Sequence, residues 1–158
     1  MLTRKRHGVP PAPKLWFTNV VRCLGDAVKI RVVFVSGRPI GSIMTLQHRS
    51  TLVYKYGCSD ARFHSLGTMP FLFWRAIEDA KELGLETFDL GRSDLDNPGL
   101  STFKERLGGT ASTLTYYRYP ARAAVTRRSS TAIASRVLSR LPGPILVTLG
   151  RALYRHIG

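Results

Sequence analysis

Acidic residues are scarce in this chain, and the scarcity is uneven. The 158 residues include 24 Lys and Arg but only 10 Asp and Glu, which gives a formal net charge of +14. Residues 120–158 contain seven Arg and no acid, whereas residues 37–119 contain ten Lys and Arg and nine acids. An almost neutral centre is ordinary for a soluble domain that binds small molecules. The charge therefore assigns the basic character to the two ends of the chain and leaves the centre without a nucleic-acid signature.

Cysteine is also rare. Cys23 and Cys58 lie 35 positions apart, and neither belongs to a Cys-x-x-Cys or Cys/His pattern. This excludes a zinc-binding motif and a disulfide framework, and it fits reduced thiols in a cytosol. We expect no metal and no redox cofactor.

Long apolar runs are absent as well. The longest uncharged apolar stretch near the C-terminus, residues 141–150, contains Pro142 and Pro144 and is half of the roughly 20 residues that span a bilayer. The basic start of the chain leads into three prolines between residues 10 and 13, where a secretory signal would have an apolar segment. We therefore expect a cytoplasmic protein without a membrane span.

The centre of the chain has the pattern of a sheet followed by a helix. Residues 28–35, 40–47 and 51–56 are rich in β-branched residues and are separated by short turn-forming stretches, which predicts a three-stranded antiparallel meander. A helix should then begin at Thr68, as its cap, and stop at Gly84. Its apolar side recurs at three- and four-residue steps and should pack on the sheet: Leu72, Phe73, Ala76, Ile77, Ala80 and Leu83.

The next segments complete an α/β fold. Residues 87–90 predict a short strand, and the helix before it makes this strand a parallel neighbour of 51–56. Residues 100–107 have helical spacing, and residues 112–119 predict a final strand. The fold class is therefore α/β with a mixed sheet.

The two ends differ from this centre. Residues 129–141 and 145–157 can form amphipathic helices separated by a Leu-Pro-Gly-Pro break. We divide the chain into a basic N-terminal extension at 1–27, an α/β domain at 28–119 and a basic helical tail at 120–158.

A set of spaced motifs adds a resemblance to a known family. The motifs are Tyr56-x-x-Ser59-Asp60, Ala76-x-x-x-Ala80-x-x-x-Gly84, Phe88-Asp89-Leu90-Gly91 and Gly99-Leu100-x-x-Phe103-Lys104-x-x-x-Gly108. Together with the order of the elements, they resemble the FemAB-like branch of the GNAT acyltransferase superfamily. The resemblance covers roughly residues 25–119 and only the C-terminal half of such proteins, without the opening strand and first helices of the GNAT-like sheet.

This resemblance implies an N-acyltransferase. Its substrate would be an amine or hydroxyl of a cell-envelope sugar or peptide precursor, in peptidoglycan or exopolysaccharide biosynthesis. Acyl-CoA or aminoacyl-tRNA would be the co-substrate, and no further cofactor is required. Residues 57–67 lack the glycine-rich phosphate loop of acetyl-CoA-dependent GNAT enzymes, which keeps both donors open. A partner chain would supply the half that is absent from the match.

Three residues are candidates for the catalytic step. The resemblance places Lys104 near the donor or its phosphates, where a cation can neutralise the charge of a tetrahedral intermediate. Asp89 follows a strand at the carboxyl edge of the sheet, where a carboxylate can position or deprotonate an amine. The resemblance also implies a tyrosine in the final strand as general acid. Tyr117 is the candidate, and since Tyr116 lies on the opposite face of the expected strand, at most one of the two can point toward the cleft. The structural alternatives are a solvated helix lysine for Lys104 and a turn cap for Asp89.

Four more residues are candidates for binding the co-substrate. Arg92 can contact a phosphate, and Asp60 and His64 lie in the loop before the long helix, which faces the donor in GNAT proteins. Phe103 is the partner of Lys104 in the motif, with a place in the core as its alternative.

Two functions of other classes remain open. The chain could be a non-catalytic remnant of a GNAT domain that only associates with a partner. It could also be a basic binding module for tRNA or anionic lipid, since Arg136, Arg140, Arg151 and Arg155 accompany leucines in the tail. In the lipid case the cytoplasmic protein would lie peripherally at the inner face of the membrane.

Overall fold

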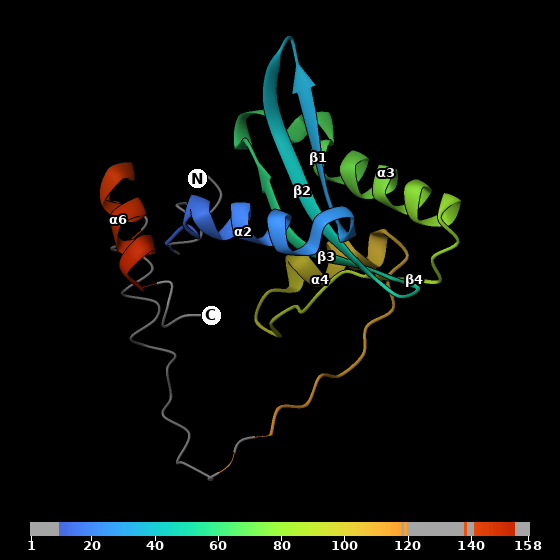
Figure 1. The fold of residues 1–158 in the computed structure, drawn as a ribbon. Helices are drawn as coiled ribbons and strands as arrows, with labels where there is room; N and C mark the ends of the chain where they lie inside the picture. The colour runs from blue at the N-terminus through green and yellow to red at the C-terminus, as the bar shows by residue number, and fades with distance from the viewer. Residues whose placement is uncertain (1–9, 118, 120–137, 139–140, 154–158) are drawn as a thin grey trace. The chain divides into compact units, whose positions relative to one another are not determined.

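The computed structural model describes residues 10–117, 119, 138 and 141–153. Contacts within the chain divide it into two compact units, shown in Figure 1. Residues 26–116 form one of them, which we call the α/β unit. Residues 1–25 and 117–158 form the other, which we call the terminal unit.

The α/β unit contains a four-stranded sheet in the order β1-β2-β3-β4. After a short 3-10 turn, η1 (Gly25–Ala27), β1 (Val28–Val35), β2 (Arg38–His48) and β3 (Thr51–Ser59) form the antiparallel meander that the sequence predicts. The first hairpin turns at Ser36 and Gly37, whose φ angles of 48° and 75° match the twist of the flanking strands.

The predicted crossover to a parallel strand is confirmed. Beyond the 3-10 helix η2 (Ala61–Leu66) and the helix α3 (Thr68–Glu82), β4 (Thr87–Asp89) runs parallel to the start of β3. The fold is therefore a mixed α/β sheet, as expected from the order of the apolar patterns.

Helix α3 packs one side on the sheet. Leu72, Phe73, Ala76 and Ala80 are buried there in one cluster with Ile43 and Leu52. Two details of the prediction are wrong. Thr68 is the first residue of the helix rather than its cap, because Gly67 takes the cap position at φ 64°, and Leu83 is 59% exposed because the helix ends before it can turn inward. The stop at Gly84, with φ 67°, is as expected.

The last helix of the α/β unit is α4 (Pro98–Arg106), which begins two residues earlier than predicted because the Asn97 side chain caps it. The strand predicted over 112–119 is wrong, since residues 111–117 form no strand. The large side chains of this segment are not packed in a core, since Leu114, Tyr116 and Tyr117 are 63%, 69% and 94% exposed. A β pattern alone does not make a strand without a neighbour to pair with.

The terminal unit contains α2 (Lys14–Leu24) and α6 (Gly143–Leu153). In α6, Leu146 is buried, and a methyl group on Gly150 would overlap the backbone oxygen of Pro11. The glycine therefore permits a close approach between α6 and the segment that leads into α2. The helix predicted over 145–157 corresponds to α6 as far as Leu153, and residues 154–157 lie outside the described part of the chain. The helix predicted over 129–141 also lies outside it except for positions 138 and 141.

Among the described helices, none is both long and apolar enough to cross a membrane.

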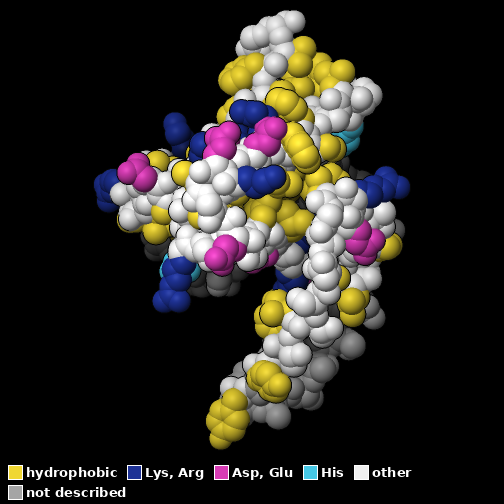
Figure 2. Space-filling view, turned by 90° about the vertical axis from the view of Figure 1, so that its right-hand side faces the viewer, with side chains coloured by type: hydrophobic (Ala, Val, Ile, Leu, Met, Phe, Trp, Pro, Cys, Tyr) yellow, Lys and Arg dark blue, Asp and Glu magenta, His cyan; other side chains and the backbone are white. Residues whose placement is uncertain are grey.

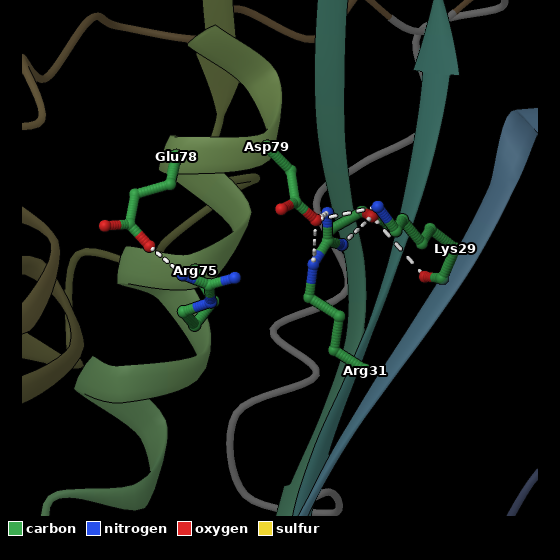
Figure 3. A network of polar contacts seen from close by, with 6 residues as sticks. Lys29, Arg31, Arg75, Glu78 and Asp79 are labelled. Atoms are coloured by element: carbon green, nitrogen blue, oxygen red, sulfur yellow. Dashed lines mark hydrogen bonds and ion pairs between the residues drawn. The ribbon is translucent and has the colours of Figure 1, made fainter. Parts of the chain in front are cut away.

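An ion-pair network ties α3 to the edge strand β1 (Figure 3). The Arg31 guanidinium donates to Asp79 Oδ2 at 2.5 and 3.0 Å and to Thr45 Oγ1 at 2.9 Å, and Lys29 Nζ reaches the same Asp79 oxygen at 2.8 Å. The side chains of Arg31 and Asp79 are only 10% and 19% exposed. Because of this shielding, the pair contributes more to the free energy of unfolding than an ordinary surface ion pair does.

We predict that Asp79→Asn lowers the free energy of unfolding by about 2 kcal/mol, because Arg31 keeps its charge in a shielded place and loses its carboxylate. Urea unfolding measures the change. Glu78→Gln on the same helix is the matched control, and we expect less than about 0.5 kcal/mol because its partner Arg75 is 54% exposed. Equal losses in the two variants would contradict the role of Asp79.

The same contact makes stability depend on acid pH. Hydrogen bonds from Lys29 and then Arg31 lower the pKa of Asp79 below its ordinary 3.8. The contribution of this carboxylate is therefore complete above the ordinary value and is lost as the pH falls through the lowered one.

Candidate functional site

Strands β3 and β4 separate after a very short parallel pairing. Their register ends at Val53 opposite Asp89, the last residue of β4, whereas β3 continues for six residues to Ser59. At this point β3 also carries a bulge, because Tyr54 and Tyr56 face consecutive residues of β2 and Lys55 has no partner there. A bulge bends its strand and increases its twist. We call this place the β3–β4 fork and define it by residues 54–57 and 89–91.

Two positions at the fork favour glycine, each for a different reason. Gly91 has a φ of 73°, and a methyl group on it would lie 3.6 Å from the Tyr54 carbonyl oxygen. A methyl group on Gly57 would overlap the hydroxyl oxygen of Tyr54. Since L residues rarely adopt a φ near 70°, Gly91 is constrained by its conformation and Gly57 by space.

The side chains of Asp89 and Lys104 both form hydrogen bonds with the backbone of Gly91 at the fork. Asp89 Oδ1 accepts a hydrogen bond from Gly91 N–H at 2.7 Å, and Lys104 Nζ donates to Gly91 O at 2.5 Å. The sequence-predicted catalytic pair is therefore brought together by α4 and the end of β4. The bond to Gly91 N–H also shows Asp89 in the turn-capping role that was its structural alternative.

The Lys104 ammonium lies in a partly dry environment. Burial lowers its pKa from the ordinary 10.5, and the Asp89 carboxylate acts in the opposite direction. A lysine has three N–H donors, and the bond to Gly91 uses one of them. Lys104 is consequently a cation next to the fork with further donor capacity, rather than a fully solvated helix lysine.

Phe103 belongs to the hydrophobic core. Its ring packs edge-on against Phe73 of α3 at a centroid distance of 5.5 Å. Phe73 also contacts Tyr54 at 4.8 Å and Phe88 at 6.0 Å. Phe103 thus fixes α4, and with it Lys104, to the two strands of the fork.

Arg92 lies in the loop after the fork and is exposed. It forms an ion pair with Asp94 at 3.2 Å and donates to Tyr116 Oη at 3.5 Å, with its guanidinium 6.0 Å from the Tyr116 ring. The hydrogen bond to Tyr116, followed by the charge of Asp94, raises the pKa of Arg92. The tyrosine that the structure connects to this loop is Tyr116, whereas Tyr117 is 94% exposed.

Asp60 and His64 follow the last residue of β3, Ser59. Asp60 accepts bonds from the backbone and guanidinium of Arg62, and Arg38 lies 3.9 Å away. The Arg62 hydrogen bond is the main cause that lowers the pKa of Asp60 to about 2. His64 Nε2 lies 3.0 Å from Ser59 Oγ. Six residues of extended strand separate this cluster from Val53, a distance of roughly 20 Å.

Sequence reasoning missed the strand residues of the fork. The β pattern predicts Tyr54 and Lys55 in a strand and Gly57 in the loop after it. A glycine at the end of a β pattern is, however, a known sign of a bulge or a close approach. The bulge itself falls on a lysine, which carries no such signal.

A cavity of about 300 Å³ lies elsewhere in the α/β unit, between β1 and α3. Its lining includes Arg31, Phe71, Arg75 and Asp79 but none of the sequence-predicted site residues. Figure 2 shows one face of the molecule on which acidic and basic side chains are mixed with hydrophobic ones. Over the described ranges, no group of three or more His, Cys, Asp and Glu could hold a metal ion.

Comparison with known proteins gives a family and a fold. The family model described as acetyltransferase (GNAT) domain matches residues 2–105, about two-thirds of the chain. No curated protein matches.

Solved structures with the same fold include several N-acetyltransferases. AAC(6')-Iy in complex with the bisubstrate analog CoA-S-monomethyl-acetylneamine has a TM-score of 0.59 at 12% identity, over 75% of this chain and 93% of that one. The aminoglycoside antibiotic 6'-N-acetyltransferase AAC(6')-Ih from Acinetobacter baumannii has a TM-score of 0.58 at 13% identity, over 71% and 84%. A ribosomal-protein-alanine N-acetyltransferase from Brucella melitensis has 0.54 at 12%, over 65% and 75%. Identities this low establish the fold alone.

We predict that Asp89→Asn lowers the pKa of Lys104 further, because the carboxylate that counteracts the burial effect is removed. NMR titration of the Lys104 side-chain carbons measures this pKa. Glu105→Gln changes the same charge on the neighbouring, exposed position of α4 and should leave it nearly unchanged. An unaltered Lys104 titration in Asp89→Asn would show that the two groups do not interact.

Proposed function

Because the chain belongs to the acetyltransferase (GNAT) domain family, we propose that it transfers an acyl group from a CoA thioester to an amine at the β3–β4 fork. The observation that carries this proposal is the separation of β3 and β4 beside a cation and a carboxylate. Six residues of β3 extend beyond the last pair with β4. An extended donor arm can add along such a strand edge as a peptide strand would.

The length of β3 beyond its last pair with β4, six residues, suits this donor. The reactive thioester would lie at the fork, near Lys104 and Asp89, and the arm would run toward Ser59. Beyond it, α3 begins without a side-chain cap and without an acidic residue in its first turn. Its first N–H groups form a region that favours a diphosphate.

A CoA donor is preferred over aminoacyl-tRNA on one further ground. AAC(6')-Iy, which shares the fold, was solved with a bisubstrate analog that contains CoA. This supports the choice although residues 57–67 lack a glycine-rich phosphate loop.

The transfer needs no covalent enzyme intermediate. The acceptor nitrogen attacks the thioester carbonyl carbon, a C–N bond forms, the C–S bond breaks, and CoA leaves as the thiol. The proton lost by the amine passes to Asp89, directly or through water, and ultimately reaches the thiolate. The remaining Lys104 donors and the backbone N–H groups of the bulged strand stabilise the oxyanion between these steps.

The acceptor that we propose is an amine or hydroxyl of a cell-envelope sugar or peptide precursor, as the FemAB-like motifs imply. The loop after the fork carries two exposed carboxylates, Asp94, which pairs with Arg92, and Asp96. Acidic side chains attract a cationic amino group. The aminoglycoside acetyltransferases that share the fold are named for an amino-sugar acceptor.

A second candidate is a domain that works only with a partner chain. The edge strand β1 supports it, because Ile30, Val32 and Phe34 point to the same side and are 50%, 42% and 59% exposed. An exposed apolar strand edge is normally covered in native proteins.

The experiment is a donor screen with acetyl-CoA, longer acyl-CoA thioesters and aminoacyl-tRNA, using amino-sugar and peptide acceptors. We expect turnover with a CoA thioester and a loss of about a hundredfold in kcat/KM for Lys104→Ala. Lys81→Ala, on the exposed side of α3, is the control and should retain full activity.

Equal trace turnover in wild type and Lys104→Ala would remove Lys104 from the mechanism. Turnover with aminoacyl-tRNA alone would show that the donor is aminoacyl-tRNA rather than a CoA thioester. No turnover with any donor would favour a domain that works only with a partner chain.

A further inference from the structure

We propose that Arg38 and Arg62 bind the 3′-phosphate of the CoA donor and thereby select CoA over donors that lack this group. The inference rests on the proposed function, because it extends the donor path from the fork past the start of α3. It is carried by two arginines that the fold of the α/β unit brings together beyond the end of β3.

The two arginines converge on one carboxylate oxygen. Arg62 Nη2 lies 2.5 Å from Asp60 Oδ2, and Arg38 Nη2 lies 3.9 Å from the same atom. Their guanidinium carbons lie 5.9 and 6.0 Å from the centre of the Phe63 ring. Arg38 is the first residue of β2, whereas Arg62 belongs to η2. A phosphate that approaches this place can therefore receive hydrogen bonds from two guanidinium groups.

The arginine pair keeps a positive charge beside its own carboxylate. Asp60 is the one acid among residues 36–77, which contain five Lys and Arg, so it balances only one of the two guanidinium groups. The Asp60 side chain is 12% exposed, whereas those of Arg38 and Arg62 are 56% and 61% exposed. The cations therefore face water and the carboxylate is shielded. This arrangement suits a phosphate monoester, which has more than one negative charge at neutral pH.

Arg38 can turn its donors to a ligand more easily than Arg62 can. Arg62 uses Nε and Nη2 in hydrogen bonds to Asp60, at 3.0 and 2.5 Å. The 3.9 Å between Arg38 and Asp60 is too long for a hydrogen bond. A phosphate bound by Arg38 therefore breaks no hydrogen bond between Arg38 and Asp60.

The arginine pair lies close to the start of α3, where the diphosphate of the donor is proposed to bind. Thr68, the first residue of α3, donates its hydroxyl to Phe63 O at 3.5 Å. A methyl group on Gly41 would overlap the Thr68 side chain, and Gly41 is only roughly 10 Å of extended strand from Arg38. In CoA the 3′-phosphate and the diphosphate are attached to the same ribose. A donor with its diphosphate at α3 therefore brings its 3′-phosphate within reach of the long Arg38 side chain.

The test compares the binding of CoA and of dephospho-CoA, which lacks the 3′-phosphate, by isothermal titration calorimetry. We expect the wild type to bind CoA about tenfold or more tightly than dephospho-CoA, because hydrogen bonds between charged groups are strong. Arg38→Ala should reduce this preference to less than about threefold and change the affinity for dephospho-CoA by less than about twofold.

Arg75→Ala is the matched control. It removes one positive charge from a side chain of similar exposure, 54%, which pairs with Glu78 on α3. This variant should keep the full preference for CoA, because Arg75 lies about two helical turns from the start of α3. Circular dichroism confirms that each variant is folded.

The possible results separate this inference from the proposed donor. Equal affinities of the wild type for CoA and dephospho-CoA would overturn the 3′-phosphate assignment and leave the CoA donor in place. A full preference in Arg38→Ala, or an equal loss of preference in Arg75→Ala, would also overturn the assignment. Binding of neither form would overturn the proposed donor and this inference with it.

Discussion

The ring of Phe73 joins the elements on which the candidate site depends. From the buried side of α3 it touches one aromatic ring on β3, one on β4 and one on α4, at centroid distances of 4.8, 6.0 and 5.5 Å. Aromatic contacts of this kind combine a large apolar burial with a preferred geometry. Because Phe103 precedes Lys104 in α4, the packing of its ring fixes the helix that carries Lys104. A site assembled from three elements can therefore be rigid although β4 is only three residues long.

The two units differ in their charge. The α/β unit has almost balanced charge and places a cation, a carboxylate and a bulged strand together, which suits chemistry on a small polar substrate. The terminal unit has charge of one sign, with thirteen Lys and Arg and no acid.

The sequence predicts the repetitive parts of the fold well, for physical reasons that can be named. The runs of β-branched residues correctly predict the three antiparallel strands. Gly84 correctly predicts the end of α3, because glycine adopts the positive φ found there. The strand predicted over 112–119 fails because its alternation has no paired neighbour. Motif spacing identified Asp89 and Lys104, but their common contact with Gly91 needs a fold that brings α4 back to β4. The bulge at Lys55 depends on the register with β2, which no local pattern encodes.

The central claim is that the fork and the part of β3 beyond its pairing with β4, residues 54–59, bind the acyl donor. Backbone amide NMR shifts measured during titration with coenzyme A test it most directly. The account predicts the largest shifts along residues 54–59, at Gly91 and at the start of α3. Shifts confined to the cavity between β1 and α3, around Arg31 and Phe71, would contradict the claim, as would no shift at saturating coenzyme A.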